Sequence, residues 1–113
     1  MTIADLAAFG ANTNEGLQRC LNNEDFYLRM VKKVPGDANF QKLYDAMTAG
    51  DQASAFDAVH AIKGISANLA LTPLFTPAAE LTEILRSRLP ADCTALVDAI
   101  RSRRNELEII CSK

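Results

Sequence analysis

The chain has 113 residues, a length that is usual for one domain, and we expect residues 1–113 to fold as a single unit. Hydrophobic residues make up 49% and charged residues 23% of the chain, a balance typical of a soluble globular protein and not of a disordered one. A net charge of −2, only 6% aromatic residues and no Trp argue against any general affinity for nucleic acid or for an anionic membrane surface.

Side chains that bind metals or form disulfides are few and dispersed. A single histidine, His60, excludes sites built from several histidines, and we expect no metal site. The cysteines Cys20, Cys93 and Cys111 are far apart, odd in number and without C-x-x-C spacing, which favours buried apolar side chains over a redox role. The N-terminus lacks signal-peptide features, and no stretch approaches the roughly 20 apolar residues of a membrane span. We therefore expect a cytoplasmic protein.

Glycine and proline are scarce and divide the chain into blocks of helix-forming residues. In the first half we expect helices near Ile3–Phe9, Asn14–Leu21, Glu24–Val34 and Asp37–Ala49. The break at Pro35–Gly36 either separates the last two of these or kinks one bent helix. Asp37 is the expected N-cap of the fourth helix.

Three longer helices follow in the second half of the chain. They are expected over Asp51–Leu71, Thr72–Leu89 and Cys93–Cys111. Thr72 followed by Pro73 is typical of an N-cap and a first helical position, and Pro77 is expected to bend the start of that helix. Short connections between such helices favour an all-α fold, an up-down antiparallel four-helix bundle with short extra N-terminal helices. Without an excess of heptads, we expect a monomer.

The fifth helix places its only histidine on the side away from the core. At about 100° per residue, one arc collects the expected core residues Ala55, Ala58, Val59, Ile62, Ile65, Ser66 and Leu69. His60 lies about 180° from the centre of that arc, and Lys63 and Gly64 share its exposed side. The other residues on that side are Phe56, Ala67 and Leu71. A small, apolar surface around one imidazole is unusual for a solvated helix face.

Two interpretations of His60 compete: an ordinary surface histidine beside a surface lysine, or a nucleophile on a docking face. Gly64 favours the second, because glycine inside a helix costs roughly 1 kcal/mol relative to alanine and space for a partner compensates for that cost. At about pH 7.5 an exposed imidazole is mostly neutral and nucleophilic, and Lys63 can screen an acquired phosphoryl group. No carboxylate pair for Mg²⁺ and no phosphate-binding glycine loop lie nearby, so the catalytic groups must come from a partner.

The sequence from His60 to Ala70, H-A-I-K-G-I-S-A-N-L-A, resembles the signature of histidine-containing phosphotransfer (HPt) domains, typically written H-x-L-K-G-x-S-x-x-L-G. Further segments extend the resemblance over nearly the whole chain: Ala49–Gly50–Asp51, Ala78–Leu81 with Arg86, Leu17, Phe26–Tyr27 and Phe40–Met47. The chain departs from the family pattern at Ile62 and Ala70, where leucine and glycine are usual, and at Pro77.

The resemblance implies a bundle that accepts a phosphoryl group from the aspartate of one response-regulator receiver domain and passes it to the aspartate of another. It implies His60 as the phosphoacceptor, Lys63 as the basic residue near the phosphoryl group and Gly64 as the small residue that leaves room for the receiver. The expected receiver-docking residues are Phe56, Gly64, Ala67 and Leu71. Mg²⁺ and the acidic pocket belong to the receiver, so no cofactor is expected on this chain.

The leading hypothesis is therefore an intermediate phosphocarrier in a multi-step two-component phosphorelay. Its expected partners are receiver domains, including that of a hybrid sensor histidine kinase, and neither nucleic acid nor a membrane. Two alternatives stay open: the phosphoacceptor domain of a chemotaxis-type histidine kinase, and a non-phosphorylated helical adaptor. The start at Met1 and a basic last helix without a linker favour a freestanding protein.

Overall fold

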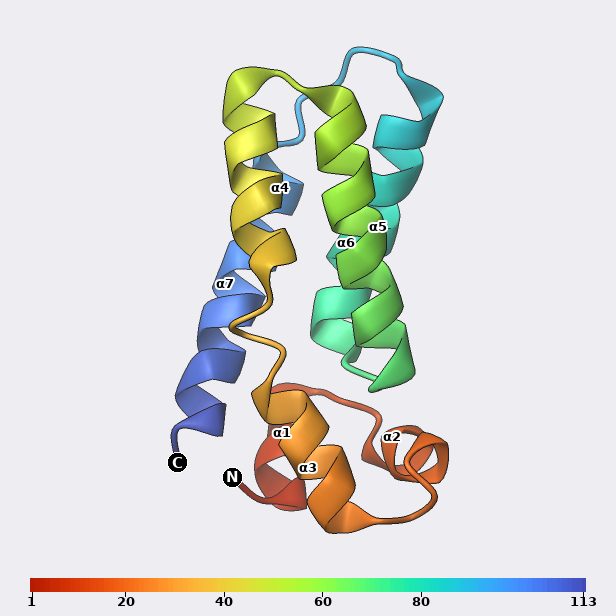
Figure 1. The fold of residues 1–113 in the computed structure, drawn as a ribbon, viewed down its shortest axis with the longest axis vertical. Helices are drawn as coiled ribbons and strands as arrows, with labels where there is room; N and C mark the ends of the chain where they lie inside the picture. Colours follow the sequence, from red (N-terminus) through yellow and green to blue (C-terminus); the bar gives the residue numbers. More distant parts are fainter.

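The computed structural model describes residues 1–113 as helices joined by short connections (Figure 1). The seven helices, in chain order, are α1 (Ile3–Phe9), α2 (Thr13–Arg19), α3 (Glu24–Lys32), α4 (Ala38–Ala49), α5 (Gln52–Asn68), α6 (Thr72–Ser87) and α7 (Thr94–Cys111). None of them combines the length and the apolar composition that a membrane crossing requires.

The long helices α4 to α7 run along the long axis of the molecule in alternating directions, and each packs beside the next (Figure 1). The short helices α1, α2 and α3 gather at one end, where α5 ends and α6 begins (Figure 1). The all-α fold predicted from the sequence, a four-helix bundle with short extra N-terminal helices, is confirmed.

Polar side chains fix where the central helices begin. The Asp37 carboxylate accepts a hydrogen bond from the backbone N–H of Asn39 at 2.8 Å, and the Asp51 carboxylate accepts one from the backbone N–H of Ser54 at 3.1 Å. Each satisfies an amide that a helix start leaves without a partner. The predicted N-cap at Thr72 is wrong, because Thr72 is already the first residue of α6. The buried Leu71 takes the capping position, without a side-chain hydrogen bond.

The Pro35–Gly36 break separates two helices and is not a kink within one. Helix α3 ends at Lys32, and α4 begins only after Asp37, whose backbone is extended. Pro35 is buried between them, and its carbonyl oxygen accepts a hydrogen bond from Arg104 Nε of α7 at 2.9 Å. The connection is therefore tied to the bundle. Pro77, by contrast, lies buried inside α6, which continues through it.

Several helices end earlier than the sequence predicts, because residues other than glycine turn into the left-handed region. Leu21 and Asn22 after α2 have φ of 58° and 57°, Ala70 after α5 has φ of 55°, and Arg88 after α6 has φ of 57°. Ala70 occupies the position where the HPt signature has glycine, and glycine adopts this conformation at no steric cost. Helix ends of this kind carry no glycine to mark them in the sequence.

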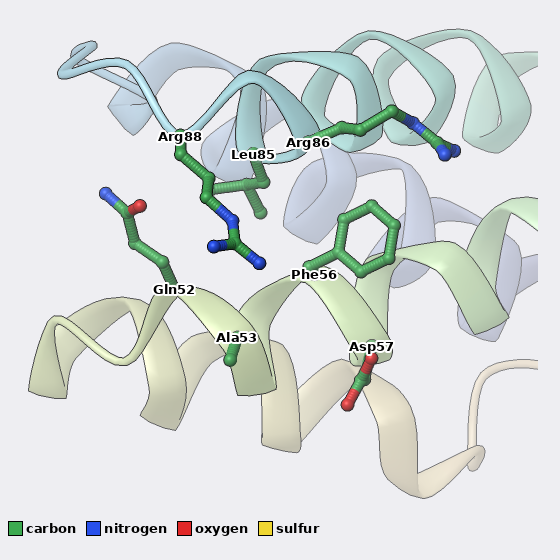
Figure 2. Close-up of a pocket in the computed structure, with 7 residues that line it drawn as sticks. All are labelled: Gln52, Ala53, Phe56, Asp57, Leu85, Arg86 and Arg88. Carbon is green, nitrogen blue, oxygen red and sulfur yellow. The ribbon is translucent and has the colours of Figure 1, made fainter.

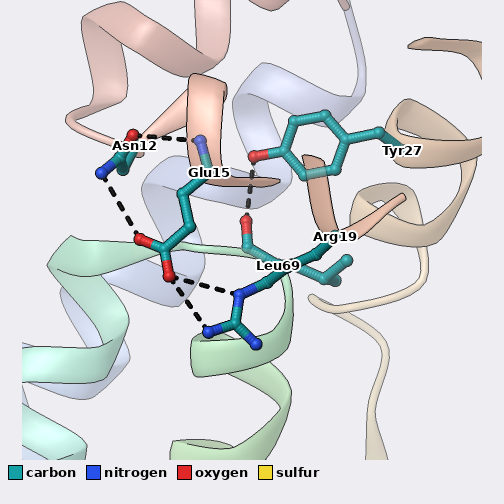
Figure 3. Close-up of polar contacts among 5 residues, drawn as sticks. All are labelled: Asn12, Glu15, Arg19, Tyr27 and Leu69. Carbon is teal, nitrogen blue, oxygen red and sulfur yellow. Dashed lines mark hydrogen bonds and ion pairs between the residues drawn. The ribbon is translucent and has the colours of Figure 1, made fainter. Parts of the chain in front are cut away.

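Tyr27 fastens the short helices to the bundle. Its side chain is fully buried, and its hydroxyl donates a hydrogen bond to the carbonyl oxygen of Leu69, just past α5, at 2.9 Å (Figure 3). Gly16 of α2 packs directly against the tyrosine ring, because a Cβ at this position would clash with the ring atoms. Burial raises the pKa of Tyr27 to about 12. One aromatic ring thus joins α2, α3 and the end of α5.

The cysteines behave mainly as apolar side chains. Cys20 and Cys93 are buried and Cys111 is half-buried, and all are free thiols. Burial raises the pKa of the Cys93 and Cys111 thiols, which keeps them in the less reactive protonated form. The expectation of buried side chains is confirmed for Cys20 and Cys93.

Candidate functional site

His60 projects into solvent from the middle of α5. The opposite face of the helix is buried and consists of Ala55, Ala58, Val59, Ile62 and Ser66. Ser66 turns its hydroxyl back onto the carbonyl oxygen of Ile62 at 2.7 Å, which satisfies it inside the core. The predicted division of α5 into a core face and an exposed histidine face is confirmed, with Ile65 half-buried at the margin.

The imidazole of His60 stacks on the ring of Phe56, which lies one helical turn earlier. The two ring centroids are 5.6 Å apart, and the planes are inclined by 28°. The side-chain hydrogen bonds formed within α5 come from Asp51, Ser54 and Ser66 and involve neither imidazole nitrogen. Both nitrogens therefore remain open to a partner molecule.

Lys63 and Gly64 lie on the same side of α5 as His60. Lys63 is half-buried and forms no ion pair, since the four ion pairs of the chain use Arg19, Arg86, Arg103 and Arg104. Its ammonium is therefore free to pair with an anion at His60. Gly64 is exposed, and a Cβ built there would meet nothing within 4 Å. The packing of this chain does not explain a glycine at that position.

Three of the four residues predicted to form the docking face are accessible to solvent. Phe56 and Ala67 are half-buried and Gly64 is exposed, so they share an accessible surface. The prediction that Leu71 belongs to this surface is wrong, because its side chain is 0% exposed and belongs to the core. The rotation of 100° per residue holds only as far as Asn68, where α5 ends, and the left-handed turn at Ala70 directs the next residue inward.

The C-terminal end of α6 brings Arg86 against Phe56 and places Arg88 in the cleft beside it, positions that the sequence did not predict. The guanidinium carbon of Arg86 lies 5.3 Å from the centroid of the Phe56 ring, and Arg86 also pairs with Glu83 at 3.4 Å. Figure 2 shows Arg88 reaching toward α5, whereas Arg86 extends along α6 in the direction in which α5 continues beyond Asp57. The packing of α6 on α5 creates this arrangement, and no local motif signals it.

A cleft of about 500 Å³ lies between α5 and α6 beside Phe56 (Figure 2). Its walls are formed by Gln52, Ala53, Phe56, Asp57, Leu85, Arg86 and Arg88. His60 does not line the cleft, and Phe56 forms the boundary between the two. The histidine therefore stands on an open surface and not in an enclosed active site, which fits a group that reacts with a second macromolecule.

The fold is a helical bundle that exposes its single histidine at the middle of α5. Residues 36–110 match the family model of the Hpt domain, which covers α4 to most of α7 and includes His60. The chain belongs to the Hpt domain family, whose members carry out histidine phosphotransfer in phosphorelays and interact with receiver domains. The match leaves out α1, α2 and α3, although the sequence resemblance extended into them. Neither a curated protein nor a solved structure matches the chain significantly.

Proposed function

We propose that the protein carries a phosphoryl group between the aspartates of two receiver domains, with His60 as the phosphoacceptor. The observation that carries the proposal is the placement of His60, the only histidine of the chain, exposed at mid-helix within the span that matches the Hpt family. The open space at Gly64 supports it, because another protein surface can approach the imidazole there.

The transfer step needs little from this chain beyond the nucleophile. The unprotonated nitrogen of the neutral His60 imidazole attacks the phosphorus of the receiver's aspartyl phosphate. A P–N bond forms, the P–O bond to the aspartate breaks, and the carboxylate leaves with the electron pair. The phosphorylated ring keeps the proton on its other nitrogen. The carboxylate of a second receiver then attacks the phosphorus, a P–O bond forms, the P–N bond breaks, and the electron pair returns to the imidazole nitrogen, which regenerates neutral His60.

Charge stabilisation is divided between the partners. Lys63, one turn after His60 on α5, screens the phosphoryl group from the side of this chain. The receiver supplies Mg²⁺ and its acidic pocket. Phe56, Gly64 and Ala67 form the surface on which the receiver docks, with Leu71 no longer part of it.

A single labelling experiment tests the proposal against its alternatives. Receiver domains charged with acetyl phosphate are mixed with this protein and with His60→Gln. We expect the wild-type protein to acquire an acid-labile, base-stable label and the variant to acquire none. Labelling only by a kinase domain with ATP would indicate the chemotaxis-type role, and binding without labelling would indicate an adaptor. A labelled His60→Gln protein would disprove the assignment, because no second histidine exists.

A further inference from the structure

We propose that Phe56 is a positioning residue: its ring holds the His60 imidazole in the orientation that a docked receiver needs. This inference rests on the proposed function, and it gives Phe56 a role beyond the docking surface to which the sequence assigned it. The stack between the two rings, with centroids 5.6 Å apart and planes inclined by 28°, is the observation behind it.

A histidine that must present one nitrogen is usually oriented by a hydrogen bond at the other. His60 forms no such bond, since the side-chain hydrogen bonds of α5 involve Asp51, Ser54 and Ser66. An exposed imidazole without a partner exchanges between staggered rotamers within nanoseconds. Stacking on Phe56 is therefore the contact that restricts the imidazole.

The Phe56 ring is itself held firmly enough to act as a platform. It is half-buried and packs against the hydrophobic core, whereas His60 is exposed. The Arg86 guanidinium lies over the ring with its central carbon 5.3 Å from the centroid, so α6 secures the ring as well. Arg86 is in turn paired with Glu83. The imidazole thus rests on a ring that two helices fix in place.

Orientation matters because attack on phosphorus proceeds in line with the bond that breaks. A docked receiver fixes its aspartyl phosphate, so an imidazole already pointing outward loses less rotational freedom on reaching the transition state. Offset stacking of two aromatic rings is a modest effect. We expect its loss to slow receiver-dependent transfer about 2- to 10-fold.

The test separates orientation from docking. Phe56→Leu and Phe56→Met remove the aromatic ring and keep an apolar side chain against the core, while Phe56→Tyr keeps the ring. Ala67→Glu, on the docking surface, serves as the comparison variant. For each we would measure the maximal transfer rate, the receiver concentration at half-maximal rate, and the three-bond NMR couplings that report the χ1 rotamer of His60.

We expect Phe56→Leu and Phe56→Met to lower the maximal rate, and Phe56→Tyr to keep the maximal rate of the wild type. Because Phe56 is also part of the docking surface, only the fall in the maximal rate reports the loss of orientation, and a rise in the half-maximal concentration reports the loss of a docking contact. The χ1 couplings should indicate one rotamer with the ring present and an average without it, whereas Ala67→Glu should change only the half-maximal concentration. An unchanged maximal rate or unchanged couplings in both ring-deletion variants would overturn the inference. If wild type accepts no phosphoryl group from a charged receiver, the proposed function fails instead, and the couplings still decide what Phe56 does.

Discussion

At the scale of single residues, the proposed mechanism assigns bond formation to His60 and charge screening to Lys63. Lys63 forms no ion pair within the chain, so its charge is available to pair with an anion. Because screening by a cation that is still in contact with solvent is modest, Lys63→Ala should slow transfer by up to about tenfold without abolishing it. Stopped-flow transfer from a charged receiver measures this. Complete loss of transfer in a folded variant would give Lys63 a larger role.

Substitutions of Gly64 separate two effects, the stability of α5 and the approach of the receiver. A Cβ at this position meets nothing within 4 Å, so alanine fits without strain. Gly64→Ala should therefore stabilise the protein by up to about 1 kcal/mol, because alanine is the better helix former. Thermal unfolding monitored by circular dichroism measures this change.

A longer side chain at the same position tests the approach of the receiver. We expect Gly64→Gln to keep a normal melting temperature but to lose most receiver-dependent phosphorylation, since the side chain occupies the space beside His60. Phosphoramidate, a small donor, should still label His60 in this variant. Equal loss with both donors would mean that His60 itself is damaged, and no loss with either would mean that the receiver docks elsewhere.

Tyr27 makes stability depend on pH in the alkaline range. Its pKa rises from 10.0 to about 12 on folding, because burial disfavours the phenolate. Between these values the unfolded chain loses the proton while the folded chain keeps it, so the free energy of unfolding falls as pH rises. Tyr27→Phe lacks the bond to Leu69 and should be about 1 kcal/mol less stable at neutral pH.

The difference in unfolding free energy between wild type and Tyr27→Phe should shrink as pH rises from 10 toward 12, because only the wild type has this phenol to ionise. Urea unfolding at several pH values measures it. Tyr44 is common to both proteins, and its own raised pKa cancels in the comparison. A constant difference across this range would show that Tyr27 ionises equally in both states.

At the scale of helices, the periodicity of the sequence predicted correctly which face of a helix is buried, but it predicted less well where a helix ends. The buried arc of α5 and the exposure of His60 follow from a rotation of 100° per residue, and Asp37 and Asp51 are N-caps with a direct sequence signal. Leu71 was misplaced because Ala70, which is not a glycine, ends the helical rotation. The contact of Arg86 with Phe56 depends on how α6 packs on α5, and no pattern within either helix encodes it.

The end of α6 offers a direct test of this explanation. Arg88 caps the helix with φ of 57°, a conformation that is costly for any side chain with a Cβ. Since Arg88 is exposed, Arg88→Gly should raise the free energy of unfolding by about 0.5 to 1 kcal/mol. Chemical denaturation measures this gain. A loss of stability would mean that the arginine side chain contributes more than its backbone costs.

At the scale of the whole molecule, the part that matches the family and the part that does not are joined through one buried ring. The match begins at residue 36, so α1, α2 and α3 lie outside it, at one end of the bundle. Tyr27 of α3 links these short helices to the carbonyl of Leu69, and the shared hydrophobic core includes Leu6 and Val31 from them. The short helices and α4 to α7 are therefore expected to unfold together.

The two ends of the chain meet at this same extremity. The Met1 ammonium donates a hydrogen bond to the carbonyl oxygen of Lys113 at 2.7 Å, so the polypeptide path is nearly a closed ring. A linker of a few residues between the ends would close the ring at little entropic cost, because the ends are already adjacent. A ring closed in this way can be opened at another connection, so that the helices follow one another in a different order along the chain and keep the same places in space. A fluorophore or fusion partner attached at either end would leave from one shared point beside α1 and the end of α7.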